Sequence, residues 1–136
     1  MREHVESYKE EVLALNDFMA RNPEIGGEEY KSSGAMVRLL TKHGIKVEYP
    51  FAGMDTAFRG VINEGKGRKA AILAEYDAFR GIGHGCGHCA SGSISVLAAL
   101  VLNMIKDQIP AEIHIIGTPD EEMRGGKVTM VNNGVF

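Results

Sequence analysis

The sequence has few cysteines and no large excess of charge of either sign, and both shortages limit what the protein can be. Two cysteines in 136 residues are too few for a disulfide-stabilised scaffold. A formal net charge of −3 provides no basic surface of the kind that binds nucleic acid. The longest apolar run, from Ile94 to Ile105, is too short to cross a membrane. We therefore expect neither a nucleic-acid partner nor a membrane partner.

The first residues lack the apolar segment of a secretory signal, because MREHVESYKEE is charged where a signal peptide needs an apolar core. This predicts a cytoplasmic protein. In that reducing compartment, neighbouring cysteines serve metal binding or catalysis more often than structural disulfides. The length and a hydrophobic content of 44% suit one globular domain.

Hydrophobic periodicity predicts both helices and strands. Apolar residues at three- and four-residue spacing indicate helices, whereas alternating or nearly continuous apolar runs indicate strands. We expect helices at residues 3–21, 28–43, 90–106 and 125–134, and strands at 45–50, 56–63, 69–77 and 112–118. The glycine-rich segment EGKGR predicts a turn between the second and third strands. From residue 70 onward, the order strand, helix, strand, helix predicts an α/β fold with a mainly parallel sheet flanked by helices.

Chemically active side chains follow two of these strands. Glu75 and Asp77 end one apolar strand, and GIGHGCGHCASG (residues 81–92) comes next. The following strand runs into GTPDEE, which ends in Glu121 and Glu122. Ligands of open α/β sheets bind beyond the carboxyl ends of the strands, where adjacent parallel strands bring their loops together. We therefore expect these two loops to form one site.

The residue types at this edge favour a metal site. Cys86 and His88 lie two residues apart, so on an extended loop their side chains point to the same side and can share an ion. Thiolate, imidazole and carboxylate groups are the ligands that zinc prefers, although manganese or cobalt could occupy such a site. Of two adjacent carboxylates, Glu121 and Glu122, one can bind metal while the other accepts a proton from water. Asp77, at the end of a buried strand, needs a partner that a metal or a histidine would supply.

Two other interpretations remain open. Cys86 and Cys89 form a C-x-x-C motif just before a helix, where a thiol–disulfide oxidoreductase carries its reactive pair. The Glu121–Glu122 pair has no role in that chemistry, which favours the metal interpretation. Alternatively, the chain is a non-catalytic interaction subunit. An open sheet edge and uncovered apolar surface would then favour self-association, so we expect a homo-oligomer.

Three segments resemble a known enzyme family. They are AEYDAFRGIGHGCGHCASGSISVLAAL, IIGTPDEEMRGGKVTMVNNGVF and RNPEIGGEEYKSSGAMVRLLTKHGIKV. Together they are similar to the zinc-dependent amidohydrolase/dipeptidase family that includes aminoacylase-like proteins, hippurate hydrolase and p-aminobenzoyl-glutamate hydrolase. The resemblance covers essentially the whole chain.

The resemblance implies roles for five residues. Cys86, His88 and Glu122 would be metal ligands, Glu121 the general base, and Asp77 a residue that orients the site. The complete enzyme would hold two metal ions. It would hydrolyse amide bonds in dipeptides or in N-acyl or aminobenzoyl amino acids, which are small-molecule substrates.

The chain also departs from the family pattern. Cys89 stands where the family has Asp or Asn, Arg80 replaces a proline, and Asp120 replaces a small residue. Family members are far longer. We therefore expect residues 1–136 to be a single incomplete catalytic domain, without the lid or dimerisation domain and without the C-terminal catalytic half that carries further metal-binding histidines. Alone, the chain is expected to hydrolyse little or nothing.

Overall fold

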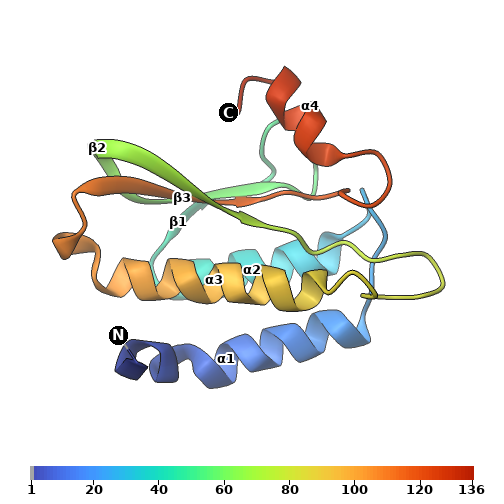
Figure 1. The fold of residues 1–136 in the computed structure, drawn as a ribbon, viewed down its shortest axis with the longest axis horizontal. Coiled ribbons are helices and arrows are strands. Elements are labelled where there is room, and N and C mark those ends of the chain that lie inside the picture. Colours follow the sequence, from blue (N-terminus) through green and yellow to red (C-terminus); the bar gives the residue numbers. More distant parts are fainter. Residues whose placement is uncertain (1) are drawn as a thin grey trace.

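Helices lie on both faces of a small sheet (Figure 1). The computed structural model describes residues 2–136. The helices are α1 (Arg2–Arg21), α2 (Tyr30–Lys42), α3 (His88–Met104) and α4 (Gly126–Asn132), with a short 3-10 turn, η1 (Lys106–Gln108). The strands are β1 (Lys46–Glu48), β2 (Phe58–Ala74) and β3 (Ala111–Gly117). None of the helices in this described part has the length and apolar character that crossing a bilayer requires.

The two predicted strands on either side of EGKGR form one long strand that folds back on itself. Asn63, Gly65 and Gly67 have positive φ angles of 57°, 82° and 54°, which turn the chain within β2. Figure 1 shows the two limbs of β2 meeting at this bend, with β3 running between them. The predicted turn is therefore confirmed.

The sheet is mixed, with β3 paired on both sides. Residues 69–74 pair with residues 112–117 in parallel. The partners of residues 58–62 run in the reverse order, from 117 back to 113. β1 adds to this first limb in antiparallel register. The expected α/β fold with flanking helices is confirmed, and so is the parallel pairing of the strands from residue 69 onward. β1 and the first limb of β2 add pairs of the opposite direction to this sheet.

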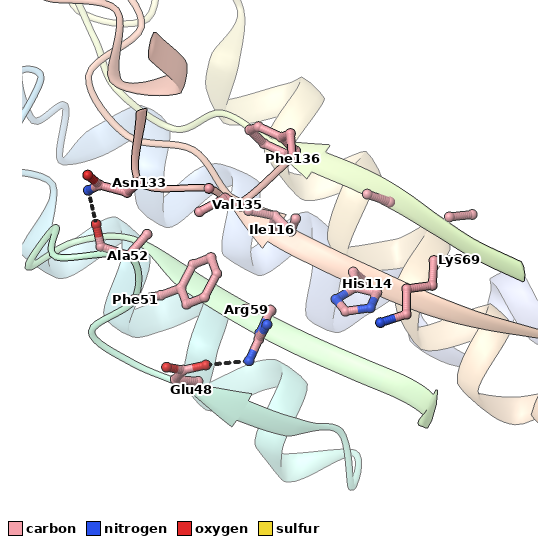
Figure 2. A pocket seen from close by; sticks show the side chains of 13 residues that line it. Glu48, Phe51, Ala52, Arg59, Lys69, His114, Ile116, Asn133, Val135 and Phe136 are labelled. Atoms are coloured by element: carbon pink, nitrogen blue, oxygen red, sulfur yellow. Dashed lines mark hydrogen bonds and ion pairs between the residues drawn. The ribbon is translucent and has the colours of Figure 1, made fainter. Parts of the chain in front are cut away.

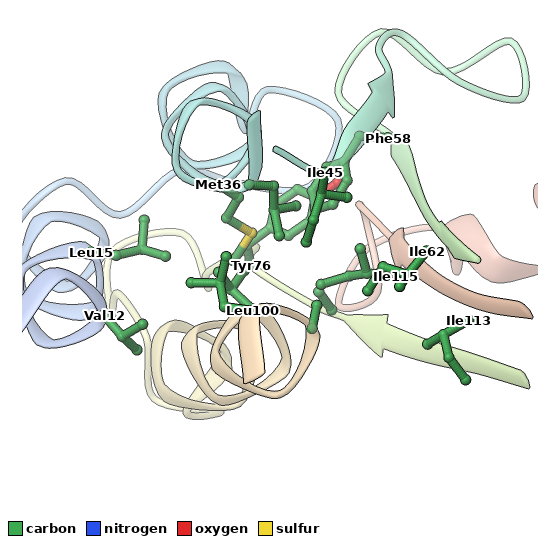
Figure 3. Close-up of a cluster of buried hydrophobic side chains, with 14 of the residues drawn as sticks. Val12, Leu15, Met36, Ile45, Phe58, Ile62, Tyr76, Leu100, Ile113 and Ile115 are labelled. Carbon is green, nitrogen blue, oxygen red and sulfur yellow. The ribbon is translucent and has the colours of Figure 1, made fainter. Parts of the chain in front are cut away.

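The main core lies between the sheet and the helices α1, α2 and α3 (Figure 3). Its largest fully buried side chains include Phe58, Tyr76, Met36 and Leu100. The Tyr76 hydroxyl donates to the Thr56 carbonyl oxygen over 2.7 Å, so the one polar atom of this side chain is satisfied in the core. This packing fixes the segment just before the site, because Tyr76 stands between the two acidic residues that end the apolar run.

The opposite face of the sheet is only partly covered. On this face, Met130 of α4 packs with Phe51 and Ile116 in a second, smaller buried cluster. The remainder is a groove of about 510 Å³, lined in part by Arg59 and His114 (Figure 2). Arg59 is bonded to Glu48 and stacked over the Phe51 ring, so the charge that it brings to this groove is already paired.

A buried carboxylate on this face holds the β2 turn against β3. Glu112 accepts the Gly65 N–H over 2.6 Å, and His114 and Lys69 lie at 2.6 and 3.3 Å. The Gly65 N–H bond, followed by the His114 and Lys69 contacts, lowers the pKa of Glu112 to about 2. The ionised carboxylate is therefore the form that the fold stabilises.

Glu112→Gln is expected to lower the free energy of unfolding at neutral pH, and the difference from wild type should depend on pH. A depressed carboxyl pKa contributes stability that is fully present above the unfolded value of 4.5 and is lost as pH falls through about 2. Urea unfolding at several pH values checks this. A difference that stays constant from pH 6 down to pH 3 would contradict it.

Candidate active site

The ends of β2 and β3 bring the two expected loops together. Ala74 and Gly117 are register partners, and the Thr118 N–H donates to the Ala74 carbonyl oxygen over 2.8 Å. Helix α3 approaches this edge closely. A Cβ atom at Gly92 would lie 2.3 Å from the Glu75 carbonyl oxygen, so only glycine permits the approach. The first turn of α3, which carries His88, is thereby held beside the strand ends.

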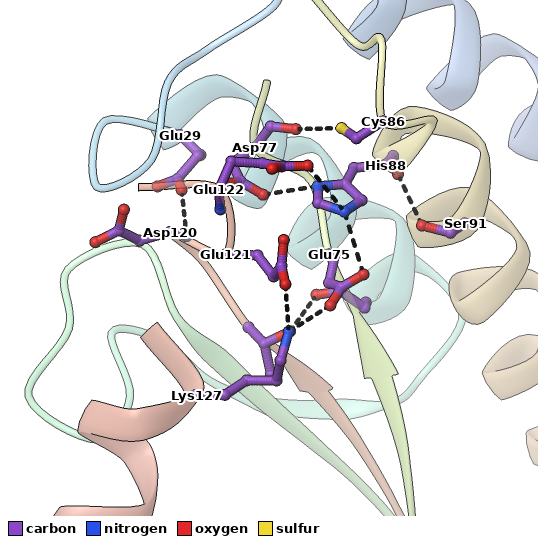
Figure 4. A network of polar contacts seen from close by, with 12 residues as sticks. Glu29, Glu75, Asp77, Cys86, His88, Ser91, Asp120, Glu121, Glu122 and Lys127 are labelled. Carbon is purple, nitrogen blue, oxygen red and sulfur yellow. Dashed lines mark hydrogen bonds and ion pairs between the residues drawn. The ribbon is translucent and has the colours of Figure 1, made fainter. Parts of the chain in front are cut away.

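Asp77 connects the two loops (Figure 4). Its side chain is fully buried. One carboxylate oxygen lies 2.8 Å from Nδ1 of His88, and the other accepts the Glu122 N–H over 2.9 Å. Because a carboxylate only accepts, Nδ1 carries a hydrogen, and Nε2 is the ring nitrogen that faces Glu75 and Glu122. Asp77 therefore sets both the tautomer of His88 and the position of Glu122.

Three of the predicted residues form a group that can hold a metal ion. One donor atom each from Cys86, His88 and Glu122 lies within 4.8 Å of the other two. Donors that bind zinc at about 2.0–2.3 Å in a tetrahedron are somewhat closer together than this, so a small contraction would complete the site. Thiol, imidazole and carboxylate suit zinc. Within residues 2–136, this is the one such group of three or more His, Cys, Asp or Glu residues.

The environment of Cys86 does not support the redox interpretation. Burial raises the pKa of the Cys86 thiol and the nearby Glu122 carboxylate adds to this, although the His88 backbone N–H opposes it. A reactive dithiol needs the opposite shift. Both cysteines are free, and Cys89 packs against the main core. Metal binding, in contrast, displaces the thiol proton directly.

Glu121 stands apart from the three donors. Its side chain is 37% exposed, and its charged partner is Lys127, whose Nζ lies 4.0 Å from Oε1. Glu121 thus lies at the rim with its carboxylate open to solvent, while Glu122 beside it faces inward. The two adjacent carboxylates therefore differ in position: Glu122 belongs to the donor group, and Glu121 lies beside it next to Lys127.

Glu75 also reaches the site, as its position at a strand end suggested. Its Oε2 lies 3.3 Å from Nε2 of His88, closer than the 3.8 Å of Glu122 Oε1. Its Oε1 accepts a hydrogen bond from Lys127 of α4. Sequence reasoning assigned Lys127 no role, since a lysine two residues after a loop is usually a solvated surface charge.

Sequence reasoning also missed Glu29, which looked like a residue of the second helix and is instead fully buried just before it. Glu29 accepts the Thr56 hydroxyl and the Asp120 N–H, each over 2.8 Å, and burial raises its pKa. Asp120 has a positive φ of 60° and bonds to Nε of Arg124 over 2.7 Å. Asp120, which departs from the family pattern, therefore anchors the loop that carries the glutamate pair through its contacts with Glu29 and Arg124.

His84 does not belong to the donor group, although it is the first residue of the His84–Cys89 segment, which contains two histidines and two cysteines. Both of its ring nitrogens are buried and have no hydrogen-bond partner in the described part of the chain. Burial lowers the pKa of His84, which favours the neutral imidazole.

Known proteins have sequences similar to that of this chain. The chain is 31% identical to the Xaa-Arg dipeptidase of Mus musculus, over 98% of the chain and 34% of that protein. It is 28% identical to a p-aminobenzoyl-glutamate hydrolase chain from Escherichia coli K12, over 97% of the chain and 31% of that protein. The chain thus spans about a third of the length of these relatives.

Solved structures share the fold. A putative aminohydrolase from methicillin-resistant Staphylococcus aureus superposes with a TM-score of 0.86 at 26% identity, over 98% of the chain and 38% of that structure. A Bacillus subtilis protein described as a dinuclear metal-binding peptidase also gives 0.86, at 20% identity, over 96% of the chain and 40% of that structure.

The family comparison covers the segment that builds the site. Residues 61–136 match peptidase family M20/M25/M40, and this segment carries both strand ends, the Cys86–His88 loop and the glutamate pair. Together with the fold, this match shows that the chain belongs to peptidase family M20/M25/M40.

Proposed function

We propose that the complete protein is a metal-dependent amidohydrolase, and that this chain supplies part of its active site. The observation that carries the proposal is the donor group of Cys86, His88 and Glu122, oriented by the buried Asp77. The substrates would be dipeptides or N-acyl or aminobenzoyl amino acids. The dipeptidase and aminobenzoyl-glutamate hydrolase among the relatives support this class.

Zinc is the proposed cofactor, with manganese or cobalt as alternatives, and the complete enzyme would hold two ions. The donor set fits a zinc-type ion, since it offers one thiol, one imidazole and one carboxylate. Such an ion polarises the substrate carbonyl and makes water more acidic.

The chain's own residues divide the remaining work. Glu121 would accept the proton of the attacking water as general base and return it to the leaving amine. Its exposed position beside the donor group suits that role. Asp77 would act as a positioning residue, because it keeps the hydrogen of His88 on Nδ1 and leaves Nε2 free to bind.

We also propose that residues 1–136 are one incomplete catalytic domain. The chain covers 31–39% of the length of its curated relatives, which supports this. A cytoplasmic location is supported by the two free cysteines, and cell fractionation would test it.

Metal binding tests the ligand assignment. The chain is expected to bind about one equivalent of zinc. Cys86→Ser and Glu122→Gln should abolish this binding, because each removes one of three donors. Asp77→Asn should weaken it by about 10–100-fold, because His88 loses its orienting carboxylate. Isothermal titration of the reduced chain, with a competing chelator, gives these values.

Two matched variants serve as controls for the same titration. Cys89→Ser and Glu121→Gln change the neighbouring thiol and the neighbouring carboxylate, and both should retain zinc. Loss of binding in Cys89→Ser with retention in Glu122→Gln would instead make the two thiols the ligands, and would overturn the proposed site.

Hydrolysis by the isolated chain is expected to be negligible. The described donor group provides three ligands for one ion, whereas the complete enzyme is proposed to hold two ions and to include a lid or dimerisation domain and a C-terminal catalytic half. Release of amine from a dipeptide, an N-acyl amino acid and p-aminobenzoyl-glutamate, with and without zinc, checks this. Zinc-dependent turnover that Glu121→Gln removes would contradict the incomplete-domain proposal while supporting the assignment of the base.

A homo-oligomer is the proposed state in solution. Large apolar side chains are exposed at several places along the chain, and those in the C-terminal segment are Met123, Val128, Val131 and Phe136. Burial of such surface favours association. Light scattering over a range of concentrations should give a mass above 14.8 kDa that falls on dilution. A constant monomer mass would exclude this state.

A further inference from the structure

Two carboxylates, those of Glu75 and Glu122, face Nε2 of His88. Only Glu122 belongs to the proposed donor group. Glu75 Oε2 is 3.3 Å from Nε2, and Glu122 Oε1 is 3.8 Å away. By distance alone Glu75 is the better placed ligand. Yet the donor group that includes Cys86 is completed by Glu122. Something other than distance must keep Glu75 from acting as a ligand.

Lys127 differs in its relation to these two carboxylates. Its ammonium donates a hydrogen bond to Glu75 Oε1. In the described part of the chain, no lysine or arginine lies within 4.0 Å of Glu122. The Lys127 and Glu75 side chains are 33% and 29% exposed, so solvent screens their attraction only in part. The ion pair neutralises Glu75 and leaves the charge of Glu122 available to a cation.

The backbone places Lys127 with little freedom. A Cβ atom at Gly126 would lie 2.0 Å from the Pro119 carbonyl oxygen, so only glycine fits between α4 and the loop that carries the glutamate pair. The Gly126 N–H donates to the Asp120 carbonyl oxygen over 2.8 Å. Lys127 follows directly, and its side chain extends toward Glu75 in Figure 4. The first turn of α4 is thus fixed to the same loop as Glu122.

We infer that Lys127 is a positioning residue that keeps Glu75 out of the metal coordination sphere and thereby selects Glu122 as the carboxylate ligand. This inference rests on the proposed metal site. Removal of the ammonium frees Glu75 to coordinate, because its carboxylate already lies beside Nε2. Glu75 would then become a fourth protein ligand beside Cys86, His88 and Glu122, either in addition to solvent or in its place, which is a change that a purely structural role for Lys127 would not produce.

Cobalt substitution tests this on the chain itself. The visible absorption of Co²⁺ is strong in four-coordinate sites and weak in sites with more ligands, so it reports the coordination number. Lys127→Met should shift or weaken the absorption per bound cobalt relative to wild type, because the Glu75 carboxylate joins the ligands or replaces solvent among them. Lys127→Arg, which retains the cation, should keep the wild-type spectrum. The double variant Lys127→Met/Glu75→Gln should recover it, because the added ligand is gone.

Control variants make each outcome decisive. Lys66→Met removes an exposed lysine from the β2 turn and should leave the spectrum unchanged. Glu75→Gln alone should also leave it unchanged, and this variant remains informative if Lys127→Met does not fold. A wild-type spectrum in Lys127→Met, or an altered one in Glu75→Gln, would overturn the inference. Absence of cobalt binding by the wild-type chain would overturn the proposed metal site as well.

Discussion

One buried carboxylate, that of Asp77, joins the two loops of the site. Its oxygens are divided between the His88 ring and the Glu122 backbone, which belong to loops after different strands. A fully buried carboxylate is costly unless it is hydrogen-bonded, so the native fold requires both loops to be in place. The geometry of the donor group is therefore a condition of stability, and a binding ion needs little further ordering of these residues.

The charges around His88 explain why this edge suits a cation. Three carboxylates, those of Glu75, Asp77 and Glu122, lie within 3.8 Å of a ring nitrogen of His88, and Lys127 is the only lysine or arginine that contacts any of them in residues 2–136. Carboxylates this close repel one another. A divalent cation relieves that repulsion, because it can be the largest local charge in such a site. The same residues would be a poor environment for a thiolate nucleophile.

Much of the site could be predicted because it depends on local order along the chain. Cys86, His88 and the glutamate pair follow apolar runs, and parallel strand ends bring such loops together. Lys127 and Glu29 could not be found this way, because their partners depend on how α4 and the start of α2 pack in three dimensions. The place of β3 was missed for a similar reason. A glycine-rich turn indicates that the chain bends, but it does not say that a third strand will lie between the two limbs.

The central place of β3 has a consequence for how the protein folds. Gly117 pairs with Phe58 on one side and with Ala74 on the other, so β3 must enter between two limbs that precede it by tens of residues. Such contacts between distant parts of a chain form late and slow the folding reaction. The strand that completes the sheet also delivers the glutamate pair. The site and the sheet should therefore assemble in the same cooperative step, with no folded intermediate that has one without the other.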